Sequence, residues 1–172
     1  NDGLQRFYKY NYKTGENTEI IKDLKVAYPM WYDKNTVISV VIVDKELDLI
    51  VSELNLGRNT TIQKKVGRSL HHIPNTSFIS YINKEKEQWE VTLFNPKNGE
   101  RRKIIDTVGK KEDICWLPDG TVLIAVGNSI MKFNPATDKN WGVFHTFPKN
   151  TYKNITRILV NSRGTRLVLV SD

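Results

Sequence analysis

Two landmarks recur along this sequence at a nearly constant interval. The first is an apolar residue followed by Asn and by turn-forming residues, and it occurs at Asn11, Asn55, Asn95 and Asn134. The second is a turn followed by Thr and an apolar run, and it occurs at Thr36, Thr76, Thr121 and Thr165, most clearly as CWLPDGTVLI at 115–124. Both recur every 39 to 45 residues, which is the length of a unit of four short strands. A tandem repeat therefore constrains the fold more than any other feature.

Each period contains four runs that are typical of strands. In the third period they lie at 89–95, 102–107, 113–117 and 121–126, and they are rich in β-branched and aromatic residues. Asn98-Gly99 and Asp119-Gly120 lie between such runs and favour hairpin turns, because these dipeptides accept positive φ. The segment at 44–54 also fits an amphipathic helix, but the repeat places a turn and a strand there. The sequence therefore predicts an all-β fold, a β-propeller of four-stranded antiparallel blades.

The period divides the chain into about four repeat units, at about 4–43, 47–83, 88–127 and 129–172, within a single propeller domain spanning 1–172. The first unit starts with the third strand of a blade, and the last stops after the second strand. This phase predicts three complete blades flanked by two half-blades. The halves could pair to close a four-bladed ring, or the chain could be part of a larger propeller. We favour the larger propeller, because the repeat stops abruptly and small rings are uncommon.

Large apolar residues precede the sharp turns. We expect Trp31, Trp116 and Leu159 to pack between adjacent sheets, because aromatic burial contributes much of the stability of stacked antiparallel layers. The Thr that follows each turn should begin the next strand, where a β-branched residue favours the extended conformation.

The landmarks also resemble a known repeat. YNYKTGE or FNPKNGE, followed by CWLPDGTVLIAV, is similar to the TolB-like and WD-like β-propeller repeat, in which a Thr-Gly turn precedes a Trp-Ser-Pro-Asp-Gly stretch. The resemblance extends over the whole chain and is best in the third unit; LHHIPNTSF and LVNSRGT depart from it. It implies a scaffold that binds proteins or ligands at the ends of a central channel. It also implies an exported, periplasmic bacterial protein, and the family has no invariant catalytic set.

Composition narrows the function only modestly. Lys and Arg number 26 against 19 Asp and Glu, giving +7, but the excess is scattered, which is more typical of a solvated surface than of a nucleic-acid groove. No apolar run approaches the roughly 18 residues of a membrane span. The chain begins at Asn1 with no signal peptide ahead of it, so we expect a processed product or a piece of a longer chain.

Residues able to do chemistry do not form a recognisable motif. His71 and His72 are adjacent on a predicted strand, so their side chains should leave on opposite faces and cannot readily hold one metal. Cys115 is the only cysteine and lies in an apolar run, which indicates a buried, inert thiol. Neither a Gly-x-Ser-x-Gly elbow nor a phosphate-binding loop is present. We therefore predict no catalytic residue, no cofactor and no metal.

The sequence favours a non-enzymatic scaffold that binds a protein or peptide partner through its loop ends and central channel. The candidate contact residues lie in or next to loops that precede the presumed innermost strands: Arg68, His71, Lys110, Lys111, Tyr152 and Lys153. The alternative is the propeller portion of an enzyme, such as a peptidase-associated propeller or a lyase or hydrolase with its site at the channel mouth. That alternative requires acidic, His or Tyr side chains to converge there. A third hypothesis is polyanion binding through the basic excess, which salt would weaken.

Overall fold

The computed structural model describes residues 5–172, and these residues form sixteen strands and no helix. We call each four-stranded sheet a blade and each two-stranded sheet a half-blade. The N-terminal half-blade contains β1 (Phe7–Tyr10) and β2 (Asn17–Ile21). Blade I contains β3 (Val26–Asp33), β4 (Thr36–Val43), β5 (Glu46–Glu53) and β6 (Arg58–Gln63). Blade II contains β7 (Val66–His72), β8 (Ile79–Asn83), β9 (Glu90–Phe94) and β10 (Arg101–Asp106). Blade III contains β11 (Ile114–Trp116), β12 (Val122–Val126), β13 (Ser129–Phe133) and β14 (Gly142–Thr146), and the C-terminal half-blade contains β15 (Ile155–Val160) and β16 (Leu167–Ser171).

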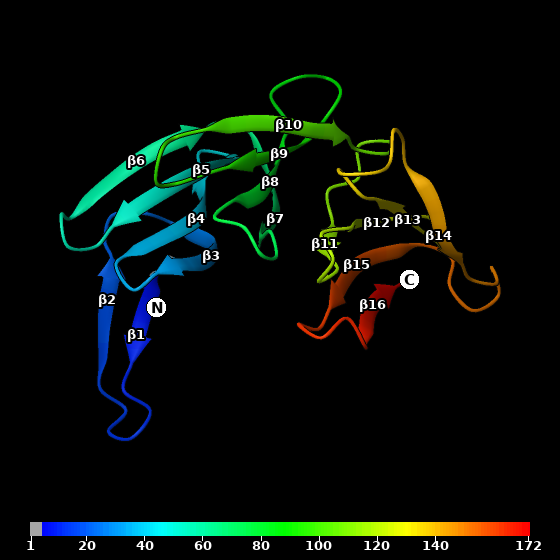
Figure 1. Cartoon of the computed structure of the whole chain (residues 1–172). Helices are drawn as coiled ribbons and strands as arrows, with labels where there is room; N and C mark the ends of the chain where they lie inside the picture. The colour runs from blue at the N-terminus through cyan, green and yellow to red at the C-terminus, as the bar shows by residue number, and fades with distance from the viewer. Residues whose placement is uncertain (1–4) are drawn as a thin grey trace.

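The sheets are arranged in an arc. Consecutive strands of each sheet pair antiparallel, and Figure 1 shows β3, β7, β11 and β15 on the inside of the arc, with β6, β10 and β14 on the outside. The two half-blades lie at opposite ends of the arc and form separate sheets. The all-β architecture of four-stranded blades is therefore confirmed, and 44–54 forms a turn and strand β5 as expected. The halves do not close a four-bladed ring.

An apolar cluster fills each of the four junctions between neighbouring sheets. Between blades I and II, the fully buried Ile38 and Leu49 meet Tyr81 from the next sheet. Between blades II and III, Ile82 and Trp116 belong to one such cluster. Because each sheet buries its faces only against its neighbours, stability is distributed along the stack.

Three of the four recurring Asn residues, Asn11, Asn95 and Asn134, form side-chain hydrogen bonds within the turn that follows them. Asn95 Oδ1 accepts the backbone N–H of Lys97 at 3.0 Å, and its carbonyl accepts that of Gly99 at 2.9 Å. Asn134 likewise accepts the N–H of Ala136 at 2.9 Å, and its Nδ2 donates to Thr121 Oγ1 at 3.1 Å. This last bond joins the two landmarks of the repeat in blade III, whereas in blade II Asn95 Nδ2 donates to Ser77 Oγ at 3.2 Å, one residue after Thr76.

The expected packing between sheets is correct for Trp116 and wrong for Trp31 and Leu159. Trp116 is 8% exposed, whereas Trp31 is 44% exposed and Leu159 is 57% exposed. Trp116 donates its indole N–H to Ser80 of the preceding blade at 2.8 Å. Trp31 faces a half-blade that contains no counterpart of β8, and its ring lies 6.2 Å from that of Phe7 between centroids.

Leu159 is exposed because it is not the residue that corresponds to Trp116 in the repeat. The backbone N–H of Gly120 donates to the carbonyl of Leu117, and the N–H of Gly164 donates in the same way to the carbonyl of Asn161. Leu117 and Asn161 therefore occupy the same position in the repeat. The counterpart of Trp116 is therefore Val160, which packs against the cluster between blade III and the C-terminal half-blade. A shift of one residue in a strand exchanges its two faces, which puts Leu159 in solvent.

The innermost strands define two ends of the arc. We call the end at which they begin the proximal end; it holds the segments 22–25, 64–65, 107–113 and 147–154. We call the end at which they finish the distal end; it holds the turns 34–35, 73–78, 117–121 and 161–166. Within residues 5–172, no helix is long and apolar enough to cross a membrane.

Candidate functional site

A small pocket opens at the proximal end, between blade II, blade III and the C-terminal half-blade. Its volume is about 170 Å³. We call it the proximal pocket, and it is lined by Arg68, Trp89, Lys110, Lys111, Glu112, Asp113, Ala125, Asn154, Ile155 and Thr156. Strand β7 and the two long connections before β11 and β15 supply most of these residues. Segments more than 80 residues apart in the sequence therefore meet at one place.

An ion-pair network forms one wall of the proximal pocket. Asp113 Oδ2 accepts hydrogen bonds from the guanidinium of Arg68, with Nε at 3.1 Å, and from Nη1 of Arg157 at 2.9 Å. Glu112 lies 3.6 Å from Arg68 Nε and 3.4 Å from Lys84 Nζ. Lys84 also lies over the Trp89 ring, 4.1 Å from its centroid, a cation–π contact. The network links blade II, the β10–β11 connection and β15.

Gly67 makes this network possible. A Cβ at Gly67 would lie 2.7 Å from Glu112 Oε2 and 2.9 Å from Ile82 Cβ. Any larger residue would push the Glu112 carboxylate out of its position beside Arg68 and Lys84. The glycine is therefore required for close approach rather than for a turn.

Burial changes the acid–base properties of three groups on or next to the innermost strands, Asp113, His71 and Cys115. Desolvation raises the pKa of Asp113, and the positive charge of Arg68 opposes that rise. Desolvation lowers the pKa of His71, so its imidazole is neutral near pH 7. Burial raises the pKa of the Cys115 thiol to about 12, in agreement with the expected inert thiol.

The two histidines point in different directions, as their adjacent positions on one strand predicted. His72 Nε2 lies 2.8 Å from the Trp31 carbonyl oxygen, and its ring stacks on Tyr32 of blade I. His71 is half-buried and interacts with the Ile114 backbone of blade III. Within residues 5–172, no three His, Cys, Asp or Glu side chains are grouped so that they could hold a metal ion.

The proximal pocket brings together three of the six contact residues that the sequence suggested, namely Arg68, Lys110 and Lys111. Tyr152 and Lys153 lie in the connection just before Asn154; Tyr152 packs edge-on against Phe147, and Lys153 is exposed. His71 does not line the pocket. Arg68 and His71 also lie within innermost strand β7 rather than before it, because β7 begins at Val66.

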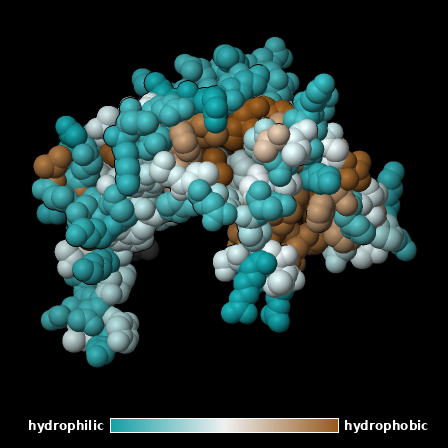
Figure 2. All heavy atoms as spheres, in the orientation of Figure 1, coloured by the Kyte–Doolittle hydropathy of each residue, from teal (hydrophilic) through white to brown (hydrophobic). Residues whose placement is uncertain are grey.

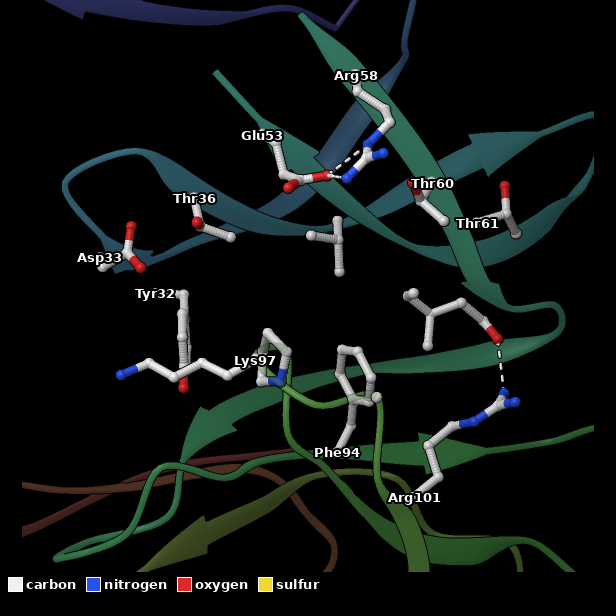
Figure 3. Close-up of a pocket in the computed structure, with 14 residues that line it drawn as sticks. Tyr32, Asp33, Thr36, Glu53, Arg58, Thr60, Thr61, Phe94, Lys97 and Arg101 are labelled. Atoms are coloured by element: carbon white, nitrogen blue, oxygen red, sulfur yellow. Dashed lines mark hydrogen bonds and ion pairs between the residues drawn. The ribbon is translucent and has the colours of Figure 1, made fainter. Parts of the chain in front are cut away.

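A larger cavity lies at the distal end, and no sequence motif indicates it. About 600 Å³ of space lies between blades I and II, bounded by Tyr32, Asp33, Glu53, Arg58, Lys97 and Arg101 among others (Figure 3). These residues come from strands β3, β5, β6 and β10 and from the turn between β9 and β10, and no short motif connects them.

Known structures resemble this arc. No protein-family model matches the chain, and no curated protein sequence matches it. A chain in the nidogen/laminin complex matches with a TM-score of 0.68 and 12% identity, covering 96% of this chain and 64% of that one. TolB from Acinetobacter baumannii matches with a TM-score of 0.65 and 10% identity, covering 96% of this chain and 42% of TolB. The chain is a β-propeller.

This propeller also resembles an enzyme. The oligogalacturonate lyase from Vibrio parahaemolyticus matches with a TM-score of 0.62 and 16% identity, covering 95% of this chain and 52% of the lyase. The propeller thus spans less than two thirds of the length of each of these three structures. At such low identity the likeness shows the fold alone, because one fold carries many functions.

Proposed function

We propose that this propeller is a non-enzymatic scaffold that binds an acidic segment of a protein or peptide partner at its proximal end. The observation that carries the proposal is the proximal pocket, where Arg68, Lys110 and Lys111 meet the connection containing Tyr152 and Lys153. Loops held on a rigid sheet scaffold are common positions for binding residues.

The charges around the proximal pocket favour an anionic partner. Glu112 and Asp113 are already paired with Arg68 and with further cations. The nearest acidic neighbour of Lys110 is the highly exposed Glu87, at 4.0 Å, and such a surface pair contributes little. Lys111 and Lys153 form no ion pair within the described part of the chain. Their positive charges therefore remain available to a partner's carboxylates.

The pairing of the carboxylates also favours binding over catalysis. A general acid or base must exchange a proton with the substrate, whereas Asp113 is held by two guanidinium groups. Both guanidinium groups would lose a charged partner if Asp113 became neutral. The carboxylates at this end therefore suit a structural role in positioning the cations.

Fluorescence anisotropy with a labelled decapeptide of alternating Glu and Ser tests this proposal. The double variant Lys110→Ala/Lys111→Ala should weaken binding about five- to tenfold, because each exposed pair contributes up to about 1 kcal/mol. Lys13→Ala, in the distant β1–β2 turn, serves as the matched control. Equal affinity of the double variant and the wild type would refute the site. If the protein bound a nucleic acid as tightly as the peptide, and if modest salt abolished both interactions, the binding would be nonspecific charge attraction.

One observation favours the enzyme alternative. Asp113 lies in the wall of a pocket and has a raised pKa, a combination that is frequent at catalytic sites. Assays against peptide, ester and glycoside panels decide between the two functions. Turnover that disappears in Asp113→Asn, while folding and anionic-peptide binding persist, would establish an enzyme and refute the scaffold.

Export to a bacterial periplasm is a further part of the proposal. It is supported by the resemblance of the repeat to TolB-like propellers and by the structural match to TolB. Fractionation of cells that produce the protein tests it, since recovery in the cytoplasmic fraction alone would contradict it.

A further inference from the structure

A second distal cavity lies between blades II and III. Its volume of about 370 Å³ is within the range of roughly 300–1,000 Å³ that is common for ligand sites. We call it the interblade pocket. It extends from the ends of two innermost strands, near Ile73 and Trp116, to Arg102 and Ile104 of β10 on the outside of the arc (Figure 1). It shares no lining residue with the proximal pocket or with the cavity between blades I and II.

The interior of the interblade pocket is apolar. Ile73, Leu93 and Trp116 are buried members of the cluster between blades II and III, and Phe78 and Ile104 pack against that cluster. All five residues also line the pocket, so this is a place where the cluster reaches the surface. Because Phe78 and Trp116 present aromatic rings, a flat aromatic group could contact them in an offset or edge-to-face arrangement.

Hydrogen bonds hold the rim of the interblade pocket in place. Asn75 Nδ2 of blade II donates to the Pro118 carbonyl of blade III at 3.3 Å, and Asn134 Nδ2 donates to Thr121 Oγ1 at 3.1 Å. Thr76 Oγ1 donates to the carbonyl three residues earlier at 2.9 Å. These polar side chains are engaged within the turns, so a ligand rich in hydroxyl groups would leave many of them unpaired. The same bonds preform the pocket, which lowers the cost of ordering it on binding.

Arg102 is the one cation among the described residues that line the interblade pocket. It is exposed and forms no hydrogen bond or ion pair within residues 5–172. Its partner across the β9–β10 ladder is the buried Leu93, so the two side chains lie on the same face of the sheet. The guanidinium is therefore attached beside the apolar interior, and a guanidinium can bind a carboxylate through two parallel hydrogen bonds.

The charges and the volume limit the class of ligand. Asp119 also lines the interblade pocket and is exposed, with Oδ1 accepting the N–H of Thr121 at 2.9 Å. A dianion such as a phosphate monoester would have one cation to pair with and would be repelled by Asp119. A volume of 370 Å³ equals that of about a dozen water molecules at about 30 Å³ each, which suits one or two fused rings.

We propose that the interblade pocket binds a small aromatic monocarboxylate, with its rings against Phe78 and Trp116 and its carboxylate on Arg102. The charge complementarity of Arg102 and the apolar interior carry this proposal together. It does not depend on the function of the proximal pocket, because the two sites share no residue.

Titration with 2-naphthoate, followed by NMR of the tryptophan indole N–H groups, tests the proposal. Trp116 lines the interblade pocket and Trp89 lines the proximal pocket, so the assigned signal that shifts locates the site. 2-Naphthoate should shift the signal of Trp116. The uncharged 2-naphthamide has a similar shape and should bind about three- to fivefold more weakly, because an ion pair at an exposed guanidinium is screened by water.

The variant Arg102→Gln tests the role of the charge. It should weaken 2-naphthoate about three- to fivefold and leave the affinity for 2-naphthamide unchanged, because only the carboxylate uses the guanidinium. Arg163→Gln is the matched control, because it makes the same change at an exposed residue in the distal turn of the C-terminal half-blade. The double variant Lys110→Ala/Lys111→Ala should bind 2-naphthoate as the wild type does, which separates this site from the proximal pocket.

Three results would overturn the proposal. The first is equal affinity of the wild type and Arg102→Gln for 2-naphthoate. The second is no shift of the Trp116 signal at millimolar 2-naphthoate, or a shift of the Trp89 signal in its place. The third is that a peptide with a free C-terminal Phe shifts the Trp116 signal and binds more than tenfold tighter than 2-naphthoate, which would assign the pocket to the C-terminus of a protein partner.

Discussion

At the scale of single residues, the environment decides what a tryptophan contributes. Trp116 is 8% exposed and hydrogen-bonded to Ser80, whereas Trp31 is 44% exposed. Trp116→Ala should lower the free energy of unfolding by about 3–5 kcal/mol, the range for buried aromatic truncations. Trp31→Ala should cost less than about 1 kcal/mol. Urea unfolding measures both, and equal losses in the two variants would show that the Trp116 site is not specifically buried.

Cys115 should be unreactive until the protein unfolds. Burial raises the pKa of its thiol to about 12, so the reactive thiolate is scarce at pH 8. Alkylation with iodoacetamide, followed by mass spectrometry, should therefore be negligible in buffer. It should accelerate across the urea unfolding transition. Complete labelling of the native chain within minutes would contradict this burial, because it would require an exposed thiolate.

At the scale of elements, the recurring Asn matters where its side chain joins two turns. Asn134 accepts the Ala136 N–H and donates to Thr121, whereas Asn55 forms no side-chain hydrogen bond within residues 5–172. Asn134→Ala should destabilise the chain by about 1–2 kcal/mol, since each lost bond costs about 0.5–1.5 kcal/mol. Asn55→Ala should stay within about 0.5 kcal/mol of the wild type. Thermal unfolding of the two variants compares them, and equal shifts in Tm would refute the anchoring role.

The repeat predicted the strands well, because turn residues and strand residues lie close together in sequence. The period placed the third-unit strands within one or two residues of β9 to β12, and it correctly preferred a strand at 46–53. The repeat did not predict which residues are buried where burial depends on the neighbouring sheet. Trp31 occupies the same position in its hairpin as Trp116, but its neighbour is a half-blade. Leu159 shows that an alignment error of one residue reverses the face of a strand.

The candidate sites were only partly predictable. Three residues of the proximal pocket were identified because loops before innermost strands gather at one end of any propeller. Glu112 and Asp113 could not be identified in the same way, because the sequence does not show that these acidic residues pair with Arg68 and Arg157. The cavity between blades I and II could not be predicted from local patterns, because residues of both blades, such as Thr60 and Lys97, line it together.

At the scale of the whole molecule, the arc should be most stable in its middle. Blade II packs against a complete blade on both sides, whereas among residues 5–172 each half-blade packs against one blade only, and one edge of β1 and one edge of β16 have no paired strand. Figure 2 shows apolar surface over the region of β15 and β16, where Val168 and Val170 are more than half exposed. In a stack with nearest-neighbour interactions, such terminal units open first.

Hydrogen exchange of the 172-residue chain should therefore be graded along the arc. Amides of β8 and β9 should exchange only through global unfolding, while those of β1–β2 and β15–β16 should exchange through local opening with a much lower free energy. Because opening a half-blade breaks one junction cluster and global unfolding breaks all four, urea should accelerate exchange more steeply in blade II than at the ends. If β1 and β16 were instead as protected as β8 and β9, their edges would have to be paired in solution, and concentration-dependent protection would assign that pairing to a second copy of the chain.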